Sequence, residues 1–151
     1  MKKRVILLDK LSAQIQNAQV QNKEVSEGTI GWHIEHSALV IIKIAETVQK
    51  SDPNHFESTF SIKRVVVFLL GKFPRGKAKA PSSVMPAENI SEEHLKESIF
   101  MAKMALQSLM DAAKNQHFAH PIFGNLNRNQ TLKFLGIHTK HHLSIIADIL
   151  K

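Results

Sequence analysis

The stretch SEEHLKESIFMAKMALQSLMDAA, residues 91–113, decides the fold class of this chain. Its apolar residues recur at intervals of three and four, as on the buried face of an amphipathic helix: Leu95, Ile99, Ala102, Ala105, Leu106, Leu109 and Ala113. Ser91 is a typical N-cap, and Glu92 and Glu93 place negative charge in the first turn, where the helix dipole favours it. The pattern predicts a helix over residues 91–116.

Four other segments show the same periodicity and predict helices over residues 3–21, 29–50, 58–72 and 129–150. The breaks between the segments contain every proline of the chain, as expected for helix breakers: Pro53, Pro74, Pro81, Pro86 and Pro121. The run Val65–Leu70 has the composition of a strand but would have no partner strand, so we expect a buried helix there. An all-α chain without a sheet follows, with a long connection over 73–90 and an irregular stretch over 118–125.

The composition limits the classes of protein to be considered. A chain of 151 residues is expected to form a single domain, 1–151. It contains no cysteine, which excludes disulfides, thiolate metal sites and a cysteine nucleophile of its own. The apolar run near the N-terminus is too short for a signal peptide, and nothing approaches a membrane span. We therefore expect a soluble, cytoplasmic protein.

The formal net charge of +7, from 20 basic and 13 acidic residues, is compatible with anionic partners. A nucleic-acid-binding domain is disfavoured, because the chain has no helix-turn-helix signature and its positive charge is spread along the sequence. We expect a small-molecule substrate or ligand, which could be anionic, and neither a nucleic acid nor a membrane as partner. An exposed face of the helices is compatible with a homodimer.

Histidines lie within the apolar side of the last predicted helix. His138 and His142 are four residues apart, which places them within about 40° of each other and one turn apart. They share their side of the helix with apolar residues: Leu135, Ile145, Ile146 and Ile149. An unsatisfied buried polar group costs roughly 1–3 kcal/mol, so the two imidazoles need partners. A metal ion satisfies both, and a hydrogen-bonded pair in the core is the alternative.

A third histidine ligand is available in Trp32-His33-Ile34-Glu35-His36, near the start of an earlier helix. His33 lies nearer the centre of the apolar side of that helix, whereas the position of His36 relative to the apolar run that follows favours His36. The residues alone leave the choice open.

Several segments together resemble the DinB-like superfamily, and most closely a bacterial branch known only as a domain of unknown function. They are the stretches 32–37, 74–77, 120–124 and 138–142, and the resemblance covers about residues 20–151. It implies a four-helix bundle with an extra short helix and a long crossover connection. It also implies a divalent metal bound by His36, His138 and His142. Members of known activity are metal-dependent hydrolases or thiol-dependent S-transferases.

We therefore expect a metal-binding protein. As an enzyme it would be a metalloenzyme that can also use a low-molecular-weight thiol. Three imidazoles suit zinc, nickel or iron(II), and they leave open positions at which the ion can activate water or orient a thiolate. His33, His120 and His141 are candidates for supporting the ligands or replacing one, and Arg75 is a candidate anion contact. The alternative is a non-catalytic bundle with a structural or vestigial metal site that binds a small ligand.

Overall fold

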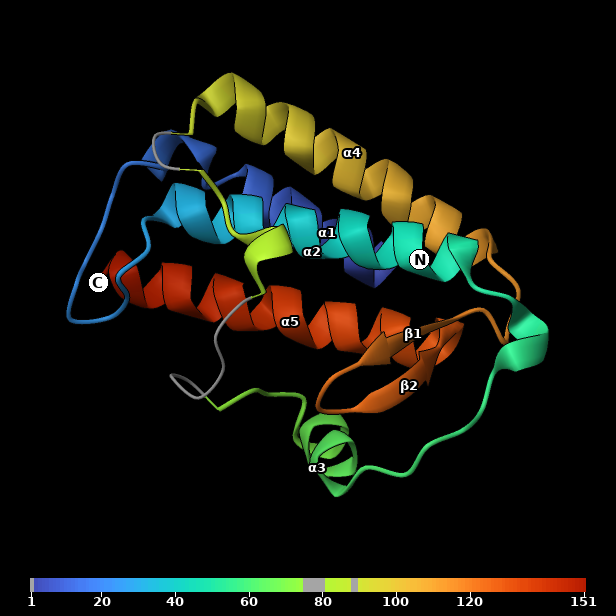
Figure 1. Ribbon diagram of the computed structural model, residues 1–151. Coiled ribbons are helices and arrows are strands. Elements are labelled where there is room, and N and C mark those ends of the chain that lie inside the picture. The colour runs from blue at the N-terminus through green and yellow to red at the C-terminus, as the bar shows by residue number, and fades with distance from the viewer. Residues whose placement is uncertain (1, 75–80, 88–89) are drawn as a thin grey trace.

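The computed structural model describes residues 2–74, 81–87 and 90–151. Within these residues the chain forms five α-helices and a two-stranded antiparallel sheet (Figure 1). The helices are α1 (Lys2–Ser12), α2 (Ile30–Lys50), α3 (Ile62–Leu70), α4 (Glu92–Asp111) and α5 (Arg128–Ile149). The strands are β1 (His117–His120) and β2 (Gly124–Asn127), and short 3₁₀ helices lie at η1 (Ile15–Asn17), η2 (Pro53–His55) and η3 (Ser82–Val84). The expectation of a mostly helical chain is confirmed.

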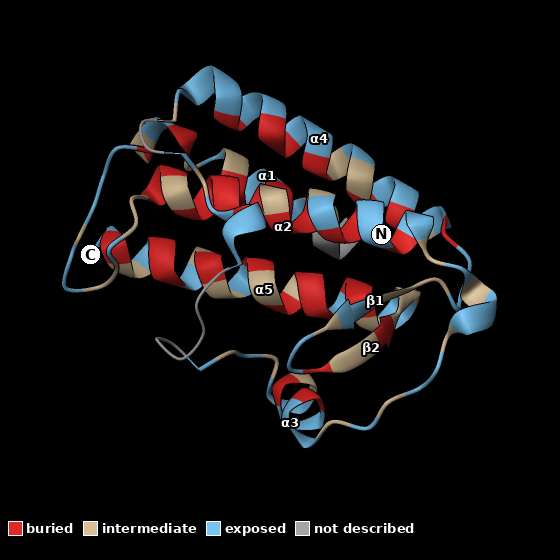
Figure 2. Ribbon diagram, viewed as in Figure 1, coloured by how far each residue is buried: buried red, intermediate tan, exposed pale blue. Residues whose placement is uncertain are grey.

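Helix α2 lies between α4 and α5 and packs against both, while α1 also contacts α4 and α5 (Figure 1). The buried residues of the long helices face one another and form one apolar core (Figure 2). The largest fully buried side chains come from all four of these helices and include Leu8, Ile34, Leu95 and Leu135. The predicted apolar faces of 91–116 and 129–150 are therefore the faces that the core uses.

Side-chain caps fix where the long helices begin. The hydroxyl oxygen of Thr29 accepts a hydrogen bond from the Trp32 N–H, and that of Ser91 accepts one from the His94 N–H. Helix α5 starts with a capping box, in which Asn127 and Gln130 each bond the backbone N–H of the other. Thr29 thus sets the register of the histidine-bearing first turns of α2.

The predicted absence of a sheet is wrong, because residues 117–127 form a β-hairpin. Phe118 pairs with Leu126, and His120 pairs with Gly124. Gly124 has φ 70°, and a Cβ atom there would collide with the Thr59 side chain. Each strand has only four residues, so neither is long enough to show an alternating pattern in the sequence.

Three predicted helices are shorter than expected, and one of them, α4, ends at Asp111 instead of residue 116. Helix α1 ends at Ser12 instead of residue 21, and the chain continues through η1, where the side chain of Asn17 bonds that of Gln14. Asn favours turns over helix interiors, in agreement with a short 3₁₀ turn at η1 in place of a continued α-helix. Helix α3 starts after the Ser61 cap and ends at Gly71, which has φ 64°.

The Val65–Leu70 run is helical, as predicted, but it is not buried. Only Arg64 and Val67 of α3 are buried, while Val65, Leu69 and Leu70 are exposed. The Arg64 guanidinium donates to the backbone carbonyls of Thr59, Phe123 and Asn125, which ties α3 to the hairpin. The cationic group anchors this helix to the hairpin, while Val67 joins the core and Phe68 packs against it.

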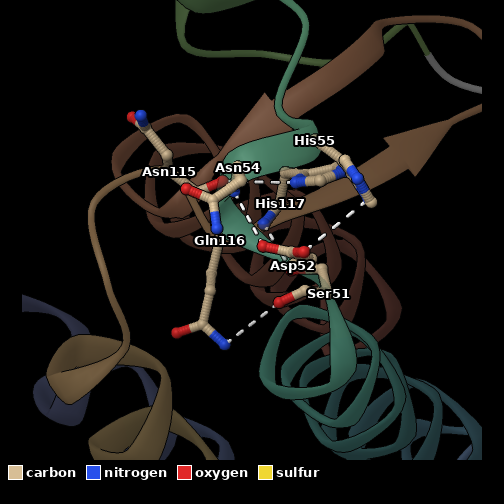
Figure 3. Close-up of polar contacts among 7 residues, drawn as sticks. All are labelled: Ser51, Asp52, Asn54, His55, Asn115, Gln116 and His117. Atoms are coloured by element: carbon tan, nitrogen blue, oxygen red, sulfur yellow. Dashed lines mark hydrogen bonds and ion pairs between the residues drawn. The ribbon is translucent and has the colours of Figure 1, made fainter.

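A second polar junction joins the end of α2 to the hairpin (Figure 3). The Gln116 amide donates to the Gln49 and Ser51 carbonyls at 3.0 and 3.5 Å, and the His117 N–H donates to Ser51 Oγ at 2.8 Å. Next to it, Asp52 caps η2 through the Asn54 N–H.

No helix among the described residues is long and apolar enough to cross a membrane.

Candidate metal centre

Four histidines from two helices converge where α2 packs against α5. Helix α2 supplies His33 and His36 from its first two turns, and α5 supplies His138 and His142 from its middle. His33, His36 and His142 are buried, and His138 is partly buried. The spacing of four residues along α5 brings the rings of His138 and His142 to 4.6 Å between centroids.

Three of the four form a group that could hold a metal ion. One ring nitrogen from each of His36, His138 and His142 lies within 4.8 Å of the other two. The His36 ring centroid is 5.2 Å from that of His138 and 4.9 Å from that of His142. All three potential ligands are imidazoles, which carry no charge when neutral, and the chain contains no cysteine that could supply a charged thiolate.

The hydrogen bond of His36 fixes which of its nitrogens carries the proton. His36 Nδ1 lies 2.8 Å from the Val84 carbonyl oxygen, which can only accept. Nδ1 must therefore carry the hydrogen, and in the neutral ring Nε2 keeps its lone pair. Val84 belongs to η3, which packs against α2 (Figure 1), so the connection between α3 and α4 orients this side chain.

His138 presents an atom whose partner is missing. Its Nδ1 is buried and has no hydrogen-bond partner among the described residues. A buried polar atom without a partner costs free energy, and a ligand bond to a cation would satisfy it. Together with the three ring nitrogens that converge within 4.8 Å, this buried atom indicates that the residues fit a divalent metal.

Burial keeps the histidines neutral. It lowers the pKa of His36 below the usual value of 6.5, although the hydrogen bond to Val84 opposes the shift. For His138 and His142, burial and then the charges of neighbouring histidines hold the pKa well below 6.5. Burial, followed by the charges of His36 and His141, lowers the pKa of His33 to about 4. Neutral imidazole is the form that binds a metal.

Aromatic rings enclose the three histidines. Trp32 stacks on His36 with ring centroids 4.9 Å apart and an interplanar angle of 13°. On the other side, Phe73 meets His138 edge-on at 6.3 Å, and Phe134 lies 5.9 Å from the same ring. These rings reduce the contact of the ligand side chains with water, which strengthens electrostatic interactions inside the site.

Three of the other predicted site residues, His33, His141 and His120, lie near this group. His33 Nδ1 is 2.9 Å from His142 Nδ1, so His33 contacts a member of the group. The ring of His141 is 5.2 Å from that of His142 and packs on Phe73. His120 Nδ1 accepts the N–H groups of Ile122 and Phe123 and so caps the hairpin turn. Arg75 lies outside the described residues.

Glu35 is the carboxylate nearest to the site in the sequence, but it faces α4. Its Oε1 is 3.1 Å from His94 Nε2, and its Oε2 is buried without a partner among the described residues.

The contributions of Val84 and Phe73 to the site could not be expected from the sequence, because both residues come from a connection without periodicity. Pro74 is the clearest sign of this irregular connection in the sequence, because a proline restricts the backbone of the preceding residue, Phe73, to extended conformations.

Comparisons with known proteins show the family of this chain and assign it neither a site nor an activity. A family model described as "Protein of unknown function (DUF1569)" matches residues 7–148, so the chain belongs to that family. An "Uncharacterized protein YuaE" of Bacillus subtilis (strain 168) is 33% identical over 78 residues, which are 48% of each chain. The match thus spans about half the length of this curated relative. No solved structure matches.

Proposed function

We propose that this member of a family without an assigned activity is a metalloprotein of the DinB-like type, with one divalent ion bound by His36, His138 and His142. The observation that carries the proposal is the convergence of the three ring nitrogens within 4.8 Å, one of the rings having a buried Nδ1 that no described residue bonds. In this proposal α1, α2, α4 and α5 are the four helices of the bundle, and the whole chain is one cytoplasmic domain.

The chain's own residues would bind and orient the ion. The Val84 carbonyl holds His36 with its Nε2 lone pair available, and Trp32 fixes the plane of the same ring. When bound, a divalent ion with three neutral imidazole ligands would lower the pKa of a water molecule or orient a thiolate. The positive charge of the ion and of the chain favours an anionic small molecule as the substrate or ligand.

The reaction class is a hydrolysis or a thiol-dependent S-transfer. Glu35 is engaged with His94 on the α4 side, so it is not a general base for this site. A metal-bound hydroxide and a metal-bound thiolate are both nucleophiles that need no further base, so this geometry is compatible with either reaction.

A structural role for the ion is the second candidate. The observation that favours it is the cover over the ligands: Val84 is 7% exposed and bonds His36, while Trp32 stacks on the same ring. A site closed in this way stabilises the packing of α2 against α5 whether or not it turns over a substrate.

Equilibrium dialysis against zinc, nickel and iron(II), followed by elemental analysis, tests the proposal. We expect one ion per chain in the wild-type protein and a loss of binding in His142→Ala, because two ligands remain. His55→Ala is the matched control, because His55 is 83% exposed and remote from the site. Stoichiometric metal in a His138→Ala, His142→Ala double variant would show that the ion binds elsewhere.

A screen of the loaded protein separates the two candidates. Low-molecular-weight thiols with electrophilic acceptors test S-transfer, and activated esters and amides test hydrolysis. Turnover that is lost in His142→Ala supports the enzyme, whereas no turnover together with a metal-dependent rise in melting temperature supports the structural ion.

A further inference from the structure

A chain of hydrogen bonds leads from His142 through His33 to Ser26. His33 Nδ1 lies 2.9 Å from His142 Nδ1, and His33 Nε2 lies 3.0 Å from Ser26 Oγ. His33 is 3% exposed, so both of its ring nitrogens are bonded away from water. Ser26 Oγ also accepts the Gly28 N–H at 3.1 Å, which holds the hydroxyl in place.

Neutral rings allow only two arrangements of protons along this chain. In the first, His142 Nδ1–H donates to His33 Nδ1, and His33 Nε2–H donates to Ser26 Oγ. In the second, both bonds run in the opposite direction, so Ser26 donates to His33 and His33 Nδ1–H donates to His142. A neutral imidazole carries one hydrogen, so each arrangement fixes the state of His142 Nε2.

Only the first arrangement leaves His142 able to bind a cation. It puts the hydrogen of His142 on Nδ1 and leaves the Nε2 lone pair free, whereas the second puts a hydrogen on Nε2 and blocks it. Histidine ligands in metal sites usually donate the other ring N–H to an acceptor, which fixes the tautomer and the ring orientation. His33 supplies that acceptor here, in place of the more common carboxylate or carbonyl.

We propose that His33, backed by Ser26, is a positioning residue that holds His142 in the tautomer and orientation that binds the ion. The proposal rests on the proposed metal site and adds the direction of its supporting hydrogen bonds. It also assigns different roles to the two histidines of α2. The nitrogens of His33 are both engaged with Ser26 and His142, while His36 is bonded at Nδ1 alone in the described part of the chain.

Zinc affinity tests the proposal, measured by competition with a chromophoric chelator. We expect His33→Leu to weaken zinc binding by roughly 10–100-fold, the usual effect of removing the partner of a ligand. His33→Asn should restore most of the affinity, because its Oδ1 can accept from His142 Nδ1–H near the same place. Ser26→Ala should give a smaller loss. Ser37→Ala is the control, because Ser37 bonds the backbone carbonyl of His33 and not its ring.

The outcomes distinguish this inference from the proposed function. A wild-type protein that binds no zinc overturns both, whereas wild-type affinity in His33→Leu overturns only the role of His33. If zinc affinity is as weak in His33→Asn as in His33→Leu, the role of His33 is also overturned, because the lost packing of the ring would then explain the effect. Complete loss of zinc from both His33 variants, with His36→Ala still binding, would make His33 a ligand instead.

Nitrogen NMR of the wild-type protein gives a readout that needs no variant. Long-range proton–nitrogen correlations distinguish a protonated ring nitrogen from a bare one. In the zinc-loaded protein we expect hydrogens on His142 Nδ1 and His33 Nε2. A hydrogen on His33 Nδ1 in the loaded protein would contradict the proposal even if every variant failed to fold.

Discussion

Two main features of the centre are set by single atoms: the Val84 carbonyl oxygen that holds His36 and the buried Nδ1 of His138. Both features require the histidine rings to be neutral at ordinary pH. Burial lowers the pKa of His33 and His120 to about 4 and that of His138 and His142 well below 6.5. In the unfolded chain the same groups titrate at about 6.5.

These shifts predict that the metal-free protein loses stability in acid. A histidine whose pKa is lowered by folding contributes stability that is complete above about pH 6.5 and is lost as the pH falls through the lower value of the folded state. Each such histidine can change the free energy of unfolding by about 1.4 kcal/mol per pH unit in this window. Urea unfolding from pH 4.5 to 8 measures the slope.

Two variants locate the source of that slope. His120→Gln should flatten the dependence between pH 4.5 and 6.5, because one of the groups with a pKa of about 4 is removed. His55→Gln, which replaces an exposed imidazole, is the matched control for the change of side chain. A free energy of unfolding that does not vary with pH in this window would refute the neutral state of the buried histidines.

At the residue scale, the sequence predicted that His138 and His142 lie together on one side of their helix. The intervals along α5 placed His138 and His142 on an apolar side, which the structure also shows. The choice between His33 and His36 could not be made locally, because both lie on the buried side of α2. The partners that separate them are Ser26, Val84 and His142, and two of these are 48 and 109 residues away.

At the scale of elements, the hairpin of β1 and β2 is the feature that the sequence did not predict. A strand of four residues gives no usable periodicity, and its stability comes from contacts with distant segments. Thr59 Oγ1 accepts the Asn125 N–H at 2.8 Å, and Arg64 binds the hairpin carbonyls. A local sign of the hairpin in the sequence is Gly124, which can adopt a positive φ at the end of a three-residue loop.

A pair of glycine substitutions tests this account of the hairpin. Gly124→Ala should destabilise the fold by roughly 1–3 kcal/mol, because the backbone has φ 70° and the new Cβ would meet Thr59. Gly136→Ala in α5 should stabilise it by about 0.5–1 kcal/mol, because a helical Cβ there meets nothing within 4 Å. Thermal unfolding of both variants compares them, and equal effects would contradict the assigned strain.

The starts of α2 and α4 were predictable because the cap residues and the core faces agree. Thr29 and Ser91 begin α2 and α4 within one residue of the expected positions. Helix α3 differs, since its apolar run is mostly exposed and a buried arginine holds it in place. Apolar composition predicted its secondary structure but not its burial, which depends on the carbonyls that Arg64 can reach.

At the scale of the whole molecule, the ion would join α2 to α5 and so stabilise the entire fold. A ligand that binds only the native state stabilises it by about 2.7 kcal/mol at 100 times its Kd. We expect zinc to raise the melting temperature at pH 7 and a chelator to reverse the rise. His142→Ala should melt at the same temperature with and without zinc. A zinc-dependent rise that persists in this variant would place the stabilising ion elsewhere.

The central claim is that His36, His138 and His142 bind one metal ion, and a crystal of the zinc-loaded protein tests it most directly. An anomalous difference map at the zinc absorption edge locates the ion without reference to any assumed ligand. We predict one strong peak per chain between α2 and α5, with nitrogens of these three histidines at roughly 2.0–2.1 Å. A peak bonded to other side chains, or no peak at this position in crystals that contain zinc, would contradict the account.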